Sequence, residues 1–361
     1  MNVKPFHSLI ILVILTSCFE NEPSKSTGGG VVIDDVWLIP QESVIDSGVG
    51  KDGIPSLEEP PRVNAEDVDY LGTNDLVIGF YTGHEYRAYP HKILDWHEII
   101  NDRDKELHFS INYCPLTGTG MAWDMFLEGQ LSGFGVSGLL YNTNLMLYDR
   151  RSESLWSQML FKCVNGEKVG DEPGYFSVFE TTWGTWKSMY PNSTVTSIET
   201  GFVRPYDIYP YIDGLTQTDY REGGFLIFPI DFDDKRLARK ERVLGININD
   251  EAKVYRFSSF EKEISVIQDQ FQGDEIVVAG SKDLNFMVAF FANTSDGTLL
   301  TFEAVKDNLP IILKDNEGNT WDVFGYALSG PREGQQLVIP KTNMGYWFAW
   351  GTFFRDAEIY K

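Results

Sequence analysis

The pattern of hydrophobic positions begins with a short apolar run near the N-terminus. Residues 9–15 (LIILVIL) follow the basic residue Lys4 and precede the small residues Thr16 and Ser17. Seven residues are too few for a membrane-spanning helix, which needs about 20 apolar residues. A positive head, a short apolar body and small residues at its end predict a secretory signal peptide over residues 1–17.

Apolar and polar residues then alternate in short runs that are typical of β-strands. Residues 75–81 and 85–89 form two such runs on either side of Thr82-Gly83-His84, and the glycine predicts a tight hairpin turn between them. Residues 107–113 alternate in the same way and predict a further strand. Strands that are joined by tight turns pair antiparallel, so the pattern favours antiparallel sheets.

Two segments have the spacing of short helices instead. Residues 92–100 (KILDWHEII) place apolar side chains and His97 on one face. Residues 183–190 are rich in aromatic side chains, and Pro191 ends the pattern because proline cannot continue a helix. The chain therefore combines many short strands with a few short helices, and we predict an α+β fold that is mainly antiparallel β.

The strand pattern occurs a second time about 165 residues further along the chain. Val77-Ile78-Gly79 corresponds to Val243-Leu244-Gly245, and Trp183 corresponds to Trp347. The spacing between matching positions stays between 164 and 168 residues over this distance. Such regular spacing is typical of an internal repeat, so we predict a tandem duplication with two homologous lobes.

The predicted boundaries divide the chain into six segments. They are the signal peptide (residues 1–17), a flexible lipid-anchored linker (18–36), an extended segment that packs on the body (37–69), the first lobe (70–200), a connector (201–235) and a second, degenerate lobe (236–361). The linker is polar and rich in glycine, which is typical of a flexible tether. In the extended segment, the expected points of contact with the body are Trp37, Ile39 and Ile54.

Composition limits the classes of partner. The chain has 361 residues, of which 53 are acidic and 30 basic, so its formal net charge is −23. A surface this acidic repels phosphate backbones, and we therefore expect no nucleic-acid partner. Hydrophobic residues make up 42% of the chain, which is enough to build a folded core and excludes global disorder.

Cys18 suggests that the signal peptide ends in a lipid anchor. Leu15-Thr16-Ser17-Cys18 resembles a bacterial lipobox, in which the cysteine is acylated and becomes the first residue of the mature protein. Acyl chains anchor a protein because each buried methylene contributes about 0.8 kcal/mol. We expect a membrane contact through the lipid on Cys18 and, because Phe19 rather than Asp follows, location at the outer membrane of the cell envelope. The alternative is an ordinary signal peptide with an incidental cysteine.

Histidine and cysteine are confined to one lobe of the predicted body. Its four histidines are His84, His91, His97 and His108, and Cys114 follows them closely, whereas the second lobe contains neither residue type. Residues that both lobes share are those that build a lobe, so residues present in one lobe alone are free for another role. We therefore expect any chemistry in the first lobe.

Cys114 is the main candidate within this lobe. Side chains alternate along a strand, so residues 107–113 present an apolar face, and Cys114 lies on the more polar face at the strand end. A thiol beside the Gly118 turn would be accessible, and His97 would meet it if the short helix packs across the strand end. The pair would form a Cys–His nucleophile couple or two ligands of a soft metal ion such as copper or zinc.

Structural roles are the alternative for the same residues. Free cysteine is among the most buried residue types, and His97 lies on the apolar face of its predicted helix. A disulfide between Cys114 and Cys163 is a third alternative, because disulfides persist outside the cytoplasm. His91 and His97 lie about 120° apart around a helix, so they cannot bind one metal ion from a single face.

Several motifs resemble those of the bacterial family known as domain of unknown function 3179. They are Lys51-Asp52-Gly53-Ile54-Pro55, Arg87-Ala88-Tyr89-Pro90, Trp96-His97-Glu98-Ile99-Ile100-Asn101-Asp102, Asn112-Tyr113-Cys114-Pro115-Leu116, Phe134-Gly135-Val136-Ser137-Gly138-Leu139-Leu140-Tyr141-Asn142 and Leu155-Trp156-Ser157-Gln158. The resemblance extends from about residue 37 to the end of the chain and implies no settled activity. Many members carry Cys-Pro-Leu-Cys, whereas Thr117 stands at the second cysteine position here, which argues against a role that needs two thiols.

Two functional hypotheses follow from these patterns. In the first, a cell-envelope lipoprotein uses Cys114, with His97, to bind a soft metal ion or to perform thiol chemistry. In the second, a lipoprotein binds an extracellular or periplasmic ligand, or acts as a scaffold, without catalysis, and Cys114 fills the core. Neither the ligand nor a reaction can be read from the sequence.

Overall fold

The computed structural model describes residues 36–213 and 216–361. The predicted signal peptide, Cys18 and nearly all of the predicted linker lie outside these residues. The structure is mostly β, with 42% strand and 9% helix, and its sheets are largely antiparallel. The predicted α+β class is therefore confirmed. None of the helices in the described ranges is long and apolar enough to cross a membrane.

Residues 36–200, here called the first half, form three five-stranded sheets and a short hairpin. The first sheet has the order β16 (Val178–Thr182), β4 (Leu76–Tyr81), β5 (Tyr86–Pro90), β17 (Thr194–Thr196), β3 (Arg62–Asn64). The second has the order β15 (Tyr175–Phe176), β8 (Thr119–Asp124), β7 (Leu107–Cys114), β6 (Ile99–Asp104), β2 (Leu57–Glu58). The third has the order β1 (Val44–Asp46), β11 (Phe134–Tyr141), β12 (Asn144–Asp149), β13 (Leu155–Ser157), β14 (Lys162–Asn165), and the hairpin pairs β10 (Gln130–Leu131) with β9 (Phe126–Leu127). The predicted hairpin is confirmed as β4 and β5, with φ of +89° at Gly83 in the turn, and the predicted strand is β7.

Residues 236–361, the second half, form three smaller sheets. Their strand orders are β27-β18-β19-β28 (Lys341–Tyr346, Arg242–Ile248, Glu251–Arg256, Glu358–Ile359), β20-β21-β22 (Ser265–Phe271, Asp274–Ser281, Phe286–Phe291) and β23-β24-β25-β26 (Phe302–Ala304, Ile311–Asp315, Thr320–Asp322, Ala327–Ser329). The order β27-β18-β19-β28 matches β16-β4-β5-β17 of the first half. In both sheets the last of these strands pairs parallel with its neighbour, β17 with β5 and β28 with β19.

The helices of the described residues are short. They are α1 (His91–His97), α2 (Trp183–Met189) and α3 (Trp347–Phe353), with 3-10 turns η1 (Gln41–Ser43), η2 (Ala65–Asp67) and η3 (Phe257–Ser259). Helix α2 confirms the prediction for residues 183–190. Helix α1 ends at His97 and not at residue 100, because Glu98 has φ of +57° and the chain continues as β6 beside β7. The predicted end of this helix was therefore wrong.

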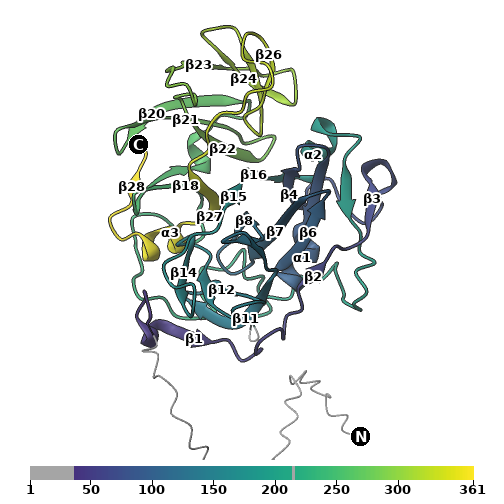
Figure 1. Ribbon diagram of the computed structural model, residues 1–361, viewed down its shortest axis with the longest axis vertical. Coiled ribbons are helices and arrows are strands. Elements are labelled where there is room, and N and C mark those ends of the chain that lie inside the picture. The colour runs from purple at the N-terminus through teal and green to yellow at the C-terminus, as the bar shows by residue number, and fades with distance from the viewer. Residues whose placement is uncertain (1–35, 214–215) are drawn as a thin grey trace, which may run out of the picture. The chain divides into compact units, whose positions relative to one another are not determined.

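The last helix of each half packs against the other half. Trp347 of α3 shares a core cluster with Cys163 of β14, and Figure 1 shows α3 beside β14. Trp186 of α2 shares a different cluster with side chains of the second half, and its ring centroid lies 6.4 Å from that of Phe324. Both clusters therefore contain residues of both halves, and Asp35–Lys361 form one compact unit.

A glycine lies under a tryptophan in each half. A Cβ atom on Gly79 of β4 would lie 2.1 Å from Cζ3 of Trp186. A Cβ atom on Gly245 of β18 would lie 2.1 Å from Cε2 of Trp350. Both distances are far below van der Waals contact, so only glycine lets the indole ring pack directly on the sheet.

The N-terminal segment and the connector surround helix α1. Strands β1, β2 and β3 of the N-terminal segment each join a sheet, and Ile39 is buried as predicted. The connector has little regular structure. The indole N–H of Trp96 donates to the carbonyl oxygen of Ile208 at 3.1 Å, and the Thr143 hydroxyl donates to the carbonyl oxygen of Phe228 at 2.9 Å. These bonds fix the connector against the first half.

Candidate functional site

His97 is the last residue of helix α1 and is fully buried. Its Nδ1 lies 2.8 Å from the carbonyl oxygen of Pro55, and its Nε2 lies 2.8 Å from the hydroxyl oxygen of Tyr206. Burial lowers the pKa of His97, so the neutral ring is favoured. Both ring nitrogens have hydrogen-bond partners, and these bonds join the helix to the N-terminal segment and to the connector.

Cys114 lies at the end of β7 and is 1% exposed. Its Sγ lies 3.8 Å from the carbonyl oxygen of Thr143 and accepts a hydrogen bond from the backbone N–H of Leu145 at 3.4 Å. Burial, together with the charge of Glu98, raises the pKa of the thiol to about 11. The structure therefore buries the thiol that the sequence analysis expected to be accessible, and it favours the protonated form.

The two predicted site residues do not share a partner. His97 and Cys114 form no hydrogen bond with each other in the described ranges. Within residues 36–213 and 216–361, no group of three or more His, Cys, Asp and Glu side chains is arranged to hold a metal ion. Cys114 and Cys163 are both free and buried, so the disulfide alternative is not realised.

Glu98 introduces a second buried ionisable group beside Cys114. It follows helix α1, is 6% exposed, and accepts a hydrogen bond of 2.8 Å from the hydroxyl group of Tyr211 in the connector. Burial raises the pKa of Glu98 to about 7, although the bond from Tyr211 opposes this shift. A carboxyl group that titrates near neutral pH therefore lies under the connector.

A polar cavity of about 340 Å³ lies beside helix α1, between the two halves. Helix α1 contributes His91, Lys92 and Asp95 to its wall, and the connector contributes Tyr209 and Arg221. Strands of both halves complete the wall with Tyr113, Glu180, Arg242 and Tyr346. Cavities with a few convergent polar groups and perturbed pKa values are the common form of ligand sites.

His91, Glu180 and Arg242 form a chain of polar contacts in this cavity. His91 Nε2 lies 3.2 Å from Oε2 of Glu180, and Arg242 donates to the other carboxylate oxygen of Glu180. Arg242 also donates to the side-chain oxygen of Asn285 at 2.7 Å. Burial lowers the pKa of His91 to about 4, despite the opposing charge of Glu180, so the imidazole is neutral at pH 7. The guanidinium and the carboxylate therefore compensate each other's charge.

Asp95 differs from Glu180 and Arg242 because no group of opposite charge compensates it within hydrogen-bond distance among the described residues. Its side chain is 5% exposed, and its Oδ1 accepts no hydrogen bond from the residues that the structure describes. Burial raises the pKa of Asp95 well above its usual range, while the charge of Arg221 opposes the shift. An unsatisfied buried polar group costs about 1–3 kcal/mol, and more when it is charged. Asp95, like Nε2 of His91 and the hydroxyl group of Tyr209, thus has hydrogen-bonding capacity that no described residue uses.

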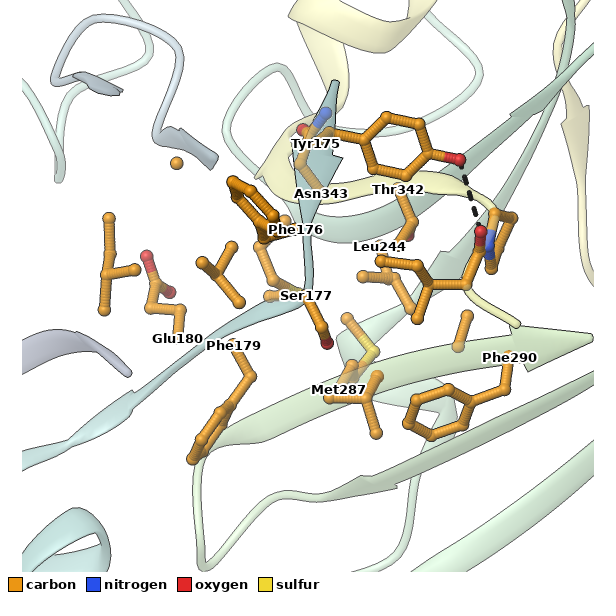
Figure 2. A pocket seen from close by; sticks show the side chains of 18 residues that line it. Tyr175, Phe176, Ser177, Phe179, Glu180, Leu244, Met287, Phe290, Thr342 and Asn343 are labelled. Atoms are coloured by element: carbon orange, nitrogen blue, oxygen red, sulfur yellow. Dashed lines mark hydrogen bonds between the residues drawn. The ribbon is translucent and has the colours of Figure 1, made fainter. Parts of the chain in front are cut away.

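A smaller cavity lies nearby, and Figure 2 shows Leu244, Met287 and Phe290 around it. Its volume is about 40 Å³. Asn343 lines it, and neither polar atom of the Asn343 side chain has a hydrogen-bond partner in the described part of the chain. A water molecule needs about 10–15 Å³ of such space, so the cavity suits water rather than an organic ligand.

A family model described as "Protein of unknown function (DUF3179)" matches residues 51–357. The chain belongs to this family. The resemblance that the motifs indicated is therefore confirmed. No curated protein and no solved structure matches this DUF3179 protein.

Among the residues of the larger cavity in this DUF3179 protein, His91 was predicted from the sequence to be specific to the first lobe, whereas Asp95, Glu180 and Arg242 were not singled out. A signal was present, because the two halves differ at these positions. Phe257 lies 166 positions after His91, Leu76 lies 166 positions before Arg242, and Met344 lies 164 positions after Glu180. Comparison of the halves for all polar residues with apolar counterparts, rather than for His and Cys alone, would have added Glu180 and Arg242 to His91.

Proposed function

We propose that this protein binds a small polar organic molecule in the cavity between its two halves. The observation that carries the proposal is the carboxyl group of Asp95, which is buried in the cavity wall and has an oxygen without a partner among the described residues. Side chains of both halves and of the connector converge on the same space. This is the ligand-binding alternative of the two hypotheses, now assigned to a specific site.

The thiol or soft-metal hypothesis has less support from the geometry. A thiolate is the form that attacks electrophiles and binds metals, whereas burial raises the pKa of Cys114 to about 11. His97 uses both ring nitrogens for other partners. Elemental analysis of protein purified without added metal or chelator tests the remaining prediction. Stoichiometric copper or zinc that is lost in Cys114→Ala would establish it.

We also propose that the two halves arose by tandem duplication. The shared strand order and the glycine–tryptophan pairs support this origin. A further correspondence is that the indole N–H of Trp156 donates to Asp149 at 3.2 Å, and that of Trp321 donates to Asp315 at 2.9 Å. Matched buried contacts at matched spacing are typical of an internal repeat.

The cell-envelope location is a separate proposal that rests on the sequence. An acylated Cys18 would hold the protein on the membrane, and the linker of residues 18–36 would act as a tether. Mass spectrometry of the mature N-terminus tests this directly. A diacylated or triacylated Cys18, absent in Cys18→Ser, is the expected result, and an unmodified N-terminus at another residue would contradict it.

A thermal-shift screen with a cavity-blocking variant tests the binding function. Asn74 is exposed and lines the cavity, so Asn74→Trp places an indole in the opening without disturbing a buried contact. Asn192 is equally exposed but does not line the cavity, so Asn192→Trp is the matched control. The screen uses a library of small polar metabolites on the wild type and both variants.

At least one compound should stabilise the wild type and Asn192→Trp but not Asn74→Trp. A ligand at 100 times its Kd adds about 2.7 kcal/mol to the free energy of unfolding, which a shift in melting temperature readily shows. If every stabilising compound acts equally on Asn74→Trp, binding occurs elsewhere and the proposal fails.

A further inference from the structure

Each cation at the cavity already has a carboxylate partner. Arg242 is paired with Glu180, and the Nε of Arg221 lies 3.0 Å from Oδ1 of Asp219. Lys92 lies 2.9 Å from Asp75 and 3.2 Å from Asp207. The cavity therefore offers no uncompensated positive charge that would select an anionic ligand.

Asp95 lacks such a partner. No Lys, Arg or His of the described residues lies within salt-bridge distance of its carboxyl group, and its Oδ1 has no hydrogen-bond donor there. In its ionised form the carboxyl group can only accept hydrogen bonds. A positively charged donor would satisfy this form and also compensate the buried charge.

Tyrosines surround Asp95 in the same cavity. Tyr113, Tyr209 and Tyr346 line the wall, and the charge of Asp95 adds to burial in raising the pKa of each phenol. The hydroxyl of Tyr209 also has no partner among the described residues. Phenol oxygens accept hydrogen bonds and aromatic faces attract cations, so both features suit the same kind of head group.

We propose that the ligand of this cavity carries a protonated amine, which donates to the carboxyl group of Asp95 and to nearby phenol oxygens, while its organic body lies among the tyrosine rings. The inference rests on the proposed binding function and specifies its ligand class. An alkylammonium group has three N–H donors, which match one carboxylate oxygen and the phenol oxygens. The net charge of −23 also attracts cationic molecules toward the protein.

Burial and an amine have opposite effects on Asp95. Burial raises the pKa of Asp95, and the charges of Asp219 and Glu98 act in the same direction, while Arg221 opposes them. Burial therefore favours the protonated form of the free carboxyl group. A bound ammonium group would favour the ionised form, and a proton displaced from the carboxyl group would pass to solvent.

Three matched probes test the ligand class by calorimetric titration. They are 2-phenylethylamine, 2-phenylethanol and phenylacetate, which share one aromatic body and differ in the charge of the head group. The test variant is Asp95→Asn, which keeps the shape of the side chain and cannot become negative. The control is Asp307→Asn, which removes one carboxylate from an exposed position far along the chain in the second half.

The amine should bind the wild type at least about tenfold more tightly than the alcohol, and phenylacetate should bind most weakly, because a charged hydrogen bond contributes more than a neutral one. Asp95→Asn should weaken amine binding at least about tenfold and remove the preference, while Asp307→Asn should change the Kd less than about twofold. An unchanged melting temperature shows that Asp95→Asn remains folded.

Other outcomes would separate the two proposals. If the alcohol or phenylacetate binds as tightly as the amine, and Asn74→Trp blocks it, the amine inference is overturned while the cavity keeps its binding function. If Asp95→Asn binds the amine as well as the wild type does, Asp95 is not the anchor and the inference also fails. If none of the probes binds, the amine inference is rejected and the metabolite screen alone decides the binding function.

Discussion

The substitution Glu98→Gln should make the protein more stable at alkaline pH and leave it nearly unchanged at acidic pH. Glu98 is 6% exposed, and burial raises its pKa from 4.5 to about 7. The folded state therefore binds a proton more readily than the unfolded state. The contribution of such a group to the free energy of unfolding is fully present at pH values below its pKa in the unfolded state. That contribution is lost as the pH rises through its pKa in the folded state.

The size of this effect follows from the difference between the two pKa values. A shift of one unit corresponds to about 1.4 kcal/mol, so the shift of Glu98 corresponds to about 3 kcal/mol in total. Most of it, about 2–3 kcal/mol, is lost between pH 5 and pH 8. Glutamine cannot ionise, and its side-chain oxygen can still accept the hydrogen bond from Tyr211. The variant should therefore lack this part of the pH dependence.

Urea denaturation at pH 5, 6, 7 and 8 measures the difference in unfolding free energy between the wild type and Glu98→Gln. The matched control is Glu333→Gln, which changes an exposed glutamate and should follow the wild type at every pH. If Glu98→Gln gains no stability relative to the wild type between pH 5 and pH 8, Glu98 is not a buried carboxyl group of raised pKa, and the reasoning is refuted.

Two further predictions concern the core. Gly79→Ala and Gly245→Ala should each lower the unfolding free energy by about 1–3 kcal/mol, because the new methyl group would overlap an indole ring; thermal denaturation measures this, and unchanged stability would contradict the packing. Cys114 should react slowly with an aromatic disulfide reagent in the native protein and fast in denaturant, because it is 1% exposed and burial raises its pKa to about 11. Fast native reaction, absent in Cys114→Ala, would revive the thiol hypothesis.

Local patterns predicted the local elements of this fold. The hairpin of β4 and β5, strand β7 and helix α2 each follow from neighbouring residues, and each was found close to its predicted bounds. The end of helix α1 was missed because a long-range pairing decides it. Ile99 pairs with Asn112 in the neighbouring strand, and this pairing overrides the helical spacing of residues 92–100.

The site was harder to predict for the same reason. The residues predicted from the sequence were the His and Cys of one half, and Cys114 was predicted to be accessible at a strand end. In the structure, Cys114 shares a core cluster with Trp347 of helix α3, which is more than 200 residues away in the chain. Burial by a distant segment cannot be seen from the alternation of a single strand.

The differences between the halves indicate why the cavity residues are charged. Phe257, Leu76 and Met344 occupy the positions that correspond to His91, Arg242 and Glu180. These three replacements are apolar, so the architecture of a half does not require charge at any of these positions. Buried charges are costly unless they are paired, and a pair often contributes no more stability than well-packed apolar side chains. The charged groups at these three positions therefore support the proposed ligand site, and Asp95, whose Oδ1 has no hydrogen-bond partner among the described residues, lines the same cavity.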